Sequence, residues 1–324
     1  MTLHLDFVKG HCGWDTLTLV PEGQIPAEEE LAGALKILAA PVHGGLEVGF
    51  MGRGERPEEI RLRMVDSTSR DWIPMCGGMS QVIGKALVET FFRDRFAVDV
   101  RAAHLSYKLV TPSGVIPLEI ELCEGRAVRT TTVMDGFASY LYQHGIEPLT
   151  LNGCETLRVG HMLVFDVAAL ERAHPGVDFT YRTAGPALDI VNGVLKAYRQ
   201  HERHEHGVVG MMYDDRPEST GDFRIYPRFY SDDLAAASLP FEFQCGTGTV
   251  AVGLALAYRS QLPFTTAQGS VLFEWGSQRA TPDPYGIRTS ELNLTLRAGR
   301  VAHASFSHSV VEILAEGKLT LPGY

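Results

Sequence analysis

Two of the five cysteines in this 324-residue chain, Cys76 and Cys245, stand in similar sequence settings. Each is followed by glycine and then by an apolar helical pattern, CGGMSQVIGKAL from Cys76 and CGTGTVAVGLAL from Cys245. The two segments also share a second glycine, Gly84 and Gly253, and their offset of 169 residues (245 − 76) is close to half of the chain. We interpret them as two copies of one module, each presenting a cysteine at the start of a helix.

A cysteine at a helix start is placed for chemistry. The first N–H groups of a helix have no partner inside it, and the helix dipole is positive there. We therefore expect the pKa of each thiol to be lowered from about 8.5 toward neutrality. The glycines that follow each sulfur leave room for a ligand to approach the backbone, so an α-carboxylate has a binding site beside each thiol.

Two such thiols suit the inversion of a carbon acid. If the two modules face each other, one thiolate can remove a proton from one face while the opposed thiol delivers a proton to the other face. The helix N-termini would stabilise the carbanionic intermediate at its carboxylate. This chemistry requires no cofactor, and we expect none.

Composition narrows the classes of partner. A formal net charge of −10 and a pI near 5.6 disfavour nucleic acids and anionic membrane surfaces, which require clustered Lys and Arg. The sequence has no apolar run of membrane-spanning length and no signal-peptide pattern at its start. Five scattered cysteines are an odd number and favour a reducing cytoplasm. We expect a small-molecule amino-acid substrate, and a homodimer is an open alternative.

Hydrophobic periodicity predicts many strands and few helices, which indicates an α+β fold of two domains. Helices are expected over Pro26–Ala40 and Asp189–His206. Among the strands, one is expected at Phe96–Val100, one over Thr156–Val167, and a last one is interrupted by a turn at Glu316-Gly317. Cys123 and Cys154 lie in apolar contexts and are expected to be buried and inert.

The two cysteine motifs, together with the opening Lys9-Gly10-His11-Cys12-Gly13-Trp14-Asp15, resemble the diaminopimelate epimerase and proline racemase superfamily. A looser likeness joins Val159–Phe165 to a substrate-contacting loop of that family. The resemblance implies two pseudo-symmetric domains, 1–133 plus 309–324 and 134–308, each a curled mixed sheet around a central helix. It implies that Cys76 and Cys245 are catalytic and that the substrate is contacted by Gly77, Gly78, Gly246, Thr247, Gly248, His11, Trp14 and His161.

This sequence departs from both family patterns at informative positions. Gly78 stands where diaminopimelate epimerases carry asparagine and proline racemases carry histidine, and Phe241 stands where proline racemases carry aspartate. Trp14 replaces an asparagine of the diaminopimelate epimerases. We therefore expect another α-amino acid or derivative as substrate, with a ring that Trp14 could stack on.

Two other functions stay open: a double-bond isomerase of a small unsaturated acid on the same fold, and a non-catalytic protein that binds a small acid. The run His201–His206 contains metal-ligating residue types, but a solvated helix end explains it, and we expect no metal. The Gly246-Thr247-Gly248 segment lacks the third glycine of a dinucleotide-binding loop.

Overall fold

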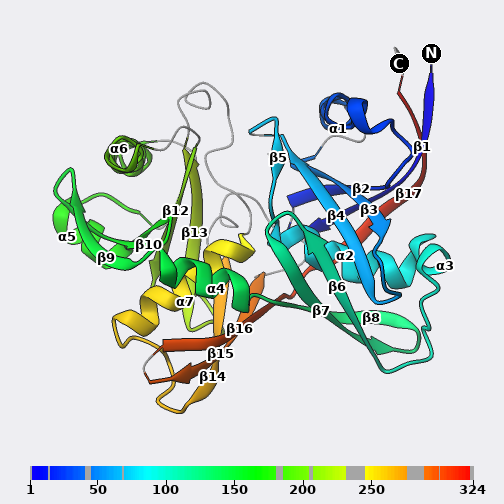
Figure 1. The fold of residues 1–324 in the computed structure, drawn as a ribbon. Coiled ribbons are helices and arrows are strands. Elements are labelled where there is room, and N and C mark those ends of the chain that lie inside the picture. The colour runs from blue at the N-terminus through cyan, green and yellow to red at the C-terminus, as the bar shows by residue number, and fades with distance from the viewer. Residues whose placement is uncertain are drawn as a thin grey trace. The chain divides into compact units, whose positions relative to one another are not determined.

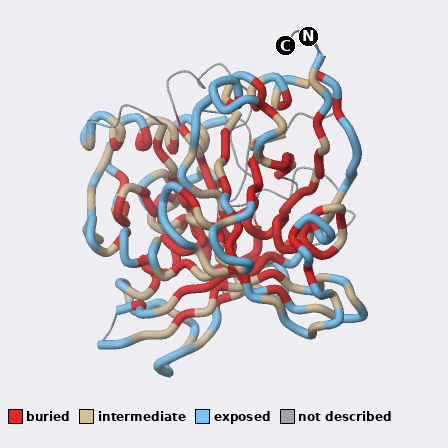
Figure 2. The backbone as a smooth tube through the Cα atoms, turned by 45° about the vertical axis from the view of Figure 1, so that its right-hand side comes forward, coloured by how far each residue is buried: buried red, intermediate tan, exposed pale blue. Residues whose placement is uncertain are grey.

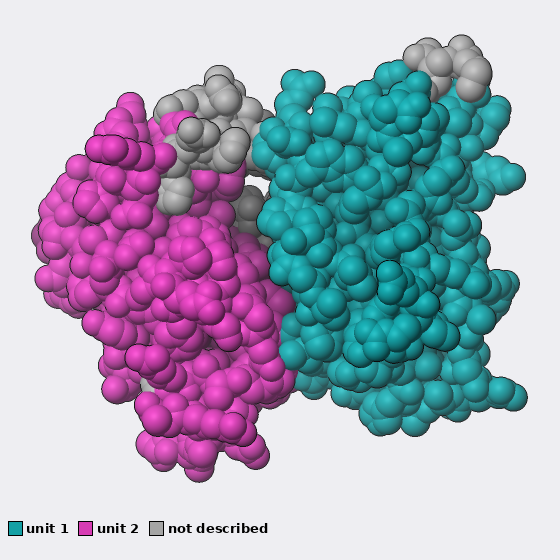
Figure 3. All heavy atoms as spheres, viewed as in Figure 1, with its two compact units in different colours: residues 1–133, 307–324 teal, residues 134–306 magenta. Residues whose placement is uncertain are grey.

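The computed structural model describes residues 2–13, 15–40, 45–67, 69–179, 185–203, 207–230, 245–275, 288–298 and 300–321. The chain is a mixed α+β protein (Figure 1). It separates into two compact units, unit 1 with residues 1–133 and 307–324 and unit 2 with residues 134–306 (Figure 3). Each unit has its own strands and helices and is described by itself.

Unit 1 is a sheet in the order β17-β1-β2-β3-β4-β6-β7-β8, with the short β5 also paired to β4. The pairings are antiparallel except for β2–β3 and β4–β6, which are parallel. Parallel neighbours need a crossover connection, and helices α1 and α2 lie in these two connections. The elements are β1 Leu3–Cys12, β2 Asp15–Pro21, α1 Glu30–Ala39, β3 Glu47–Arg53, β4 Glu59–Asp66, β5 Trp72–Ile73, α2 Gly77–Glu89, α3 Phe92–Phe96, β6 His104–Thr111, β7 Gly114–Cys123, β8 Arg126–Val133 and β17 Val311–Leu321.

Helix α2 is the centre of the unit 1 core. It contacts β17, β1 and β2 at one end of the strand order and β7 and β8 at the other, so the sheet curls around it. Eleven of its thirteen residues are buried, which is why its sequence is apolar on nearly every side. The buried polar Gln81 is satisfied inside the core, where its amide donates to the Thr132 hydroxyl at 2.7 Å. Figure 2 marks the buried residues along the chain.

Unit 2 orders its strands β9-β10-β11-β12-β13-β14-β15, antiparallel except for the parallel pairs β11–β12 and β13–β14. The strand pairs from β10 to β15 alternate between antiparallel and parallel in the same order as the strand pairs from β1 to β7 in unit 1. Helix α7 lies between β13 and β14 in the chain, as α2 lies between β4 and β6. The elements are α4 Asp135–Gln143, β9 Ile146–Leu151, β10 Cys154–Val159, β11 Met162–Asp166, α5 Val167–Ala173, α6 Pro186–Glu202, β12 Val208–Asp214, β13 Phe223–Tyr230, α7 Gly246–Tyr258, β14 Gln268–Trp275, β15 Thr289–Arg297 and β16 Arg300–His308, whose end passes into unit 1.

The two faces of the unit 2 sheet are covered by different helices. Helix α7 contacts β10, β11, β12 and β15, and ten of its thirteen residues are buried. On β12, Met211 meets Gly248 of α7, whereas the next residue, Met212, packs into a core cluster with α5 and α6. Because side chains alternate along a strand, α7 lies on one face and α5 with α6 on the other.

Several sequence predictions need correction. The strand expected at Phe96–Val100 is wrong: Phe92–Phe96 is helix α3, whose two phenylalanines, four residues apart, are both buried. The strand expected over Thr156–Val167 is a hairpin, because Gly160 at φ 62° forms the turn between β10 and β11. The turn expected at Glu316-Gly317 is absent, since β17 runs through it opposite Val8 and Phe7.

The predictions for two helices and for two cysteines are confirmed in part. The predicted helix Pro26–Ala40 is a 3-10 turn followed by α1, and the predicted helix Asp189–His206 is α6, with residues 204–206 outside the described part of the chain. Cys154 is buried as expected. Cys123 is exposed, contrary to expectation, because it lies at the end of β7 before a two-residue turn.

The glycines shared by the two cysteine modules permit close packing of each helix on its sheet. A Cβ on Gly84 would lie 2.3 Å from the Thr130 hydroxyl oxygen and 2.9 Å from its Cβ, and a Cβ on Gly253 would lie 2.3 Å from Leu292. Thr130 is β-branched on a strand and cannot turn aside freely. Gly84 therefore sets the distance between α2 and β8.

We predict that Gly84→Ala lowers the free energy of unfolding by about 1–3 kcal/mol through overpacking. Urea denaturation monitored by circular dichroism measures this free energy of unfolding. The control is Gly136→Ala on α4, where a Cβ meets nothing within 4 Å. Helix propensity should make that variant neutral or up to about 1 kcal/mol more stable. Equal stabilities of the two variants would contradict the packing argument.

Candidate active site

Cys76 is the N-cap of helix α2. Its backbone is extended (φ −132°, ψ 126°), and its Sγ accepts a hydrogen bond from the Met79 N–H at 3.2 Å. The glycines Gly77 and Gly78 form the first turn and are buried, so no side chain stands between the sulfur and the helix N-terminus. The sequence thus places a partly buried thiol at the positive end of a 13-residue helix, as predicted.

Two carboxylates belong to the surroundings of Cys76. Glu47, at the start of β3, is hydrogen-bonded to the thiol, and Asp15, at the start of β2, acts on it electrostatically. Asp15 is 3% exposed, and the Oε2 atom of Glu47 is buried. Both strand starts lie at the same edge of the sheet, since β2 and β3 run parallel there. Cys76 therefore shares its environment with two acids.

These surroundings correct the expected pKa of Cys76. Burial of the thiol and the negative charges of Glu47 and Asp15 raise its pKa well above the usual value for cysteine, and only the Met79 N–H acts in the opposite direction. The predicted lowering by the helix N-terminus is thus outweighed. At neutral pH Cys76 is a protonated thiol that donates to Glu47, the state suited to a proton donor.

Cys245 repeats this arrangement in unit 2. It is the N-cap of α7 with an extended backbone, and its Sγ accepts a hydrogen bond from the Gly248 N–H at 3.3 Å. The Thr247 hydroxyl lies 3.4 Å from the same sulfur, a contact in which either atom can be the donor. The Thr249 hydroxyl donates to the Cys245 carbonyl at 2.8 Å and fixes the cap. Gly246 and Gly248 are buried in the first turn.

Gly248 is required by packing as well as by access to the thiol. A Cβ at this position would lie 2.3 Å from the sulfur of Met211 on β12. Helix α7 therefore packs tightly against β12 at the turn that holds Cys245.

The predicted histidines lie in different settings. His11 on β1 is 1% exposed, and its Nε2 lies 3.7 Å from a Glu312 carboxylate oxygen across the β1–β17 pair. His161, in the turn between β10 and β11, makes T-shaped ring contacts with Phe137 and Tyr140 of α4, at centroid distances of 6.2 and 5.6 Å. Their roles at a substrate stay predictions, and Trp14 lies outside the described residues.

Sequence reasoning missed Glu47. This residue begins strand β3, Glu47–Arg53. The available signal was a single acid directly before the apolar Val48-Gly49-Phe50-Met51, a pattern typical of a carboxylate at the end of a buried strand.

Comparison with known proteins gives matches among solved structures. No protein-family model and no curated protein matches the sequence. A hydroxyproline epimerase from Agrobacterium vitis, solved with trans-4-hydroxy-L-proline, is similar over 98% of this chain and 91% of its own, with 13% identity and a TM-score of 0.62. A methylitaconate-delta-isomerase is similar over 99% and 96%, with 13% identity and a TM-score of 0.64. A phenazine biosynthesis protein from Bacillus anthracis is similar over 98% and 99%, with 14% identity and a TM-score of 0.58.

The raised pKa of Cys76 leads to a test by alkylation. We predict that Cys76 reacts slowly with iodoacetamide at neutral pH and faster as the pH rises, because the thiolate is the nucleophile. In Glu47→Gln the repelling carboxylate is gone, so the pKa falls and the rate profile shifts to lower pH. Mass spectrometry of the Cys76 peptide measures the rate. Glu58→Gln, an exposed acid of the same unit, is the control and should leave the profile unchanged. An unchanged profile in Glu47→Gln would refute the assigned cause.

Proposed function

We propose that this chain, which has the fold of the proline racemase and diaminopimelate epimerase-like superfamily, is an isomerase that inverts the α-carbon of an amino acid or amino-acid derivative. Cys76 and Cys245 are its acid–base pair. The observation that carries the proposal is the repeated cap: each cysteine begins a 13-residue helix and accepts the N–H of the third residue beyond it.

The repeat supports two pseudo-symmetric domains. The same succession of antiparallel and parallel pairings occurs in both units, and the cysteine helix occupies the same place in each. We assign the domains as 1–133 plus 309–324 and 134–308.

The mechanism follows from the local chemistry of each cysteine. Cys76 is a protonated thiol at neutral pH and delivers a proton to the α-carbon, while Cys245 removes the α-proton from the other face. In the reverse direction Cys76 must first lose its proton, and Glu47 is the carboxylate placed to accept it. The backbone N–H groups of Gly77, Gly78 and Gly246 hold the substrate carboxylate as negative charge develops, while the Gly248 N–H caps the Cys245 sulfur.

The charges around Cys76 favour an amino acid over an unsaturated acid. Glu47 and Asp15 place two carboxylates at this thiol, which suits a substrate that carries an ammonium group. A purely acidic substrate would add like charge. We place Trp14 against a ring or apolar side chain of the substrate and His11 and His161 at its periphery, and Thr247 beside the Cys245 sulfur.

A double-bond isomerase is the second candidate. The hydrogen bond between Cys76 and Glu47 gives one face of the site two groups that exchange protons, which a proton shift between two carbons of an unsaturated acid could use. Such a reaction moves a double bond and changes ultraviolet absorbance, whereas inversion changes only chirality.

The test is incubation in D₂O with a panel of amino acids, reading α-deuterium by mass spectrometry and chirality by chiral chromatography. We predict that deuterium enters the α-position as the D and L forms mix. Cys76→Ser and Cys245→Ser should each lower the rate by at least about 10²-fold, because each removes one proton carrier.

Cys123→Ser is the matched control, since Cys123 is exposed at the end of β7. Its rate should equal that of the unaltered chain. Deuterium exchange without inversion would favour a one-base reaction, and ultraviolet changes with unsaturated acids would favour the isomerase. Full activity of either serine variant would reject the two-thiol mechanism.

Opposition of the two thiols has its own test. We predict that mild oxidation with diamide links Cys76 to Cys245, because two thiols that serve one α-carbon can form a disulfide when no substrate separates them. Mass spectrometry of the unreduced peptides identifies the link, and activity should return with reductant. Peptides that link Cys76 to Cys123 instead would count against the opposition.

A further inference from the structure

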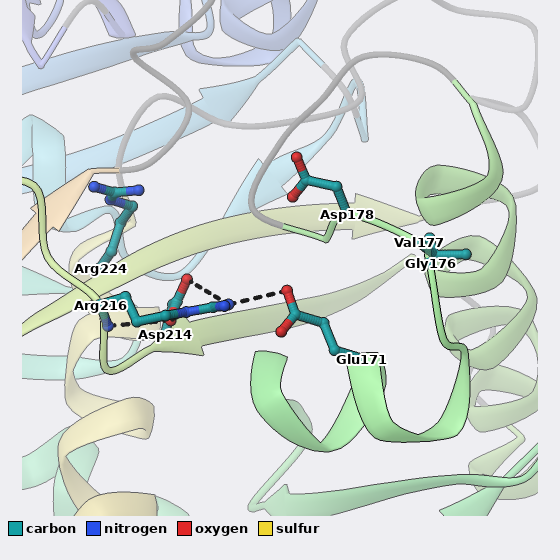
Figure 4. Close-up of a pocket in the computed structure, with 7 residues that line it drawn as sticks. All are labelled: Glu171, Gly176, Val177, Asp178, Asp214, Arg216 and Arg224. Atoms are coloured by element: carbon teal, nitrogen blue, oxygen red, sulfur yellow. Dashed lines mark hydrogen bonds and ion pairs between the residues drawn. The ribbon is translucent and has the colours of Figure 1, made fainter.

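Unit 2 contains an open pocket of about 480 Å³ that the proposed reaction does not use. It is lined by Glu171 on α5, by residues 176–178, and by Asp214, Arg216 and Arg224 from the connected ends of β12 and β13. Figure 4 shows the charged side chains bordering one open space. The volume suits a small organic ligand.

Arg224 is a buried cation in the wall of this pocket. The residue is 3% exposed. Its Nη1 lies 3.4 Å from the Tyr226 hydroxyl, and within the described part of the chain its Nη2 makes no hydrogen bond, although Glu218 and Glu274 carboxylate oxygens lie 3.2 and 3.8 Å away. A buried guanidinium with such weak hydrogen bonding gains from an added acceptor.

Of these two acids, Glu218 lies closer and is partly exposed, whereas the buried Glu274 is already engaged. Glu274 accepts backbone N–H groups of Glu218, Ser219 and Gly221 at 2.6, 2.8 and 3.0 Å. Its carboxylate therefore serves the loop between β12 and β13 and is fixed in place. Neither acid forms a hydrogen bond with Nη2 of Arg224 in the described part of the chain, so this is the atom to which a ligand carboxylate can bind.

The opposite wall is acidic and preorganised. Arg216 holds Asp214 through two hydrogen bonds of 2.7 and 3.1 Å and Glu171 through one of 3.0 Å, so its charge is compensated by these two acids. Asp178 adds an exposed carboxylate at the rim. The five charged lining residues sum to −1, from three acids and two arginines. A dianion such as phosphate is therefore poorly matched to this pocket.

We propose that this pocket is a second binding site, for a zwitterionic α-amino acid. Arg224 takes the carboxylate of the ligand, and Asp178 with Glu171 takes its ammonium group. A ligand with both charges in one small molecule matches a wall of each sign, whereas a singly charged ion matches only one.

The site is separate from Cys245 within unit 2. Helix α7 ends at Tyr258, and the guanidinium of the next residue, Arg259, donates to the Tyr213 hydroxyl at 2.6 Å. Cys245 lies at the other end of the helix, about 20 Å away. Asp214, the next residue on β12, lines the pocket. Because successive side chains point to opposite faces, the pocket lies on the face covered by α5, away from α7.

Hydrogen–deuterium exchange with mass spectrometry tests this site directly. The probes are the twenty standard L-amino acids in turn, with sodium acetate and methylammonium chloride as singly charged controls. We expect at least one amino acid to slow exchange in segments 171–178 and 214–224, and neither control ion to do so. Cys76→Ser should leave this protection intact, which separates the site from the proposed catalytic one.

Arg224→Gln and Asp178→Asn should each lower the affinity for the protecting amino acid by about tenfold or more, as measured by titration. Arg101→Gln, an exposed arginine of unit 1 paired with Asp99, is the matched control and should bind normally. If Arg224→Gln fails to fold, the exposed Asp178→Asn decides. Equal protection by acetate, unchanged affinity in Asp178→Asn, or no protection by any amino acid would each overturn the proposal.

Discussion

The hydrogen bond from a helix N–H to a cysteine Sγ fixes the geometry on which the rest of the molecule depends. It occurs twice, at Cys76 and at Cys245, and each time the helix that follows the cysteine begins with a buried glycine. That helix must in turn be held rigidly, and both units do so by burying it on almost every side. In each unit the strands surround the buried helix, and the crossover connection that contains this helix places the cysteine at its N-terminus.

The helix dipole alone does not decide the protonation state of such a thiol. At Cys76 the favourable N–H is opposed by burial and by the charges of Glu47 and Asp15, and the opposing effects are larger. A lowered pKa is therefore not a general property of a capping cysteine. It depends on which strand ends meet at the cap, and this differs between sites that look alike in sequence.

The sequence was sufficient for the features that are local. Glycine after cysteine followed by an apolar run predicted both caps, and helical periodicity located α1 and α6 to within a few residues. Features that depend on distant strands were missed. Glu47 meets Cys76 only because β2 and β3 are parallel neighbours, and the phenylalanines of α3 look like a strand until their shared buried face is known. The charged pocket likewise requires the register of β12 and β13, which no local pattern contains.

The long pairing of β17 with β1 has a consequence for the order of folding. Residues 311–321 complete the sheet around α2, although every other element wholly within unit 1 lies before residue 134. All strands that lie wholly within unit 2 precede β17 in the chain. During synthesis from the N-terminus, the second unit thus has its full set of strands while the first still lacks one neighbour of β1. Unit 1 is made first and finished last, and its open edge along β1 needs protection until β17 emerges.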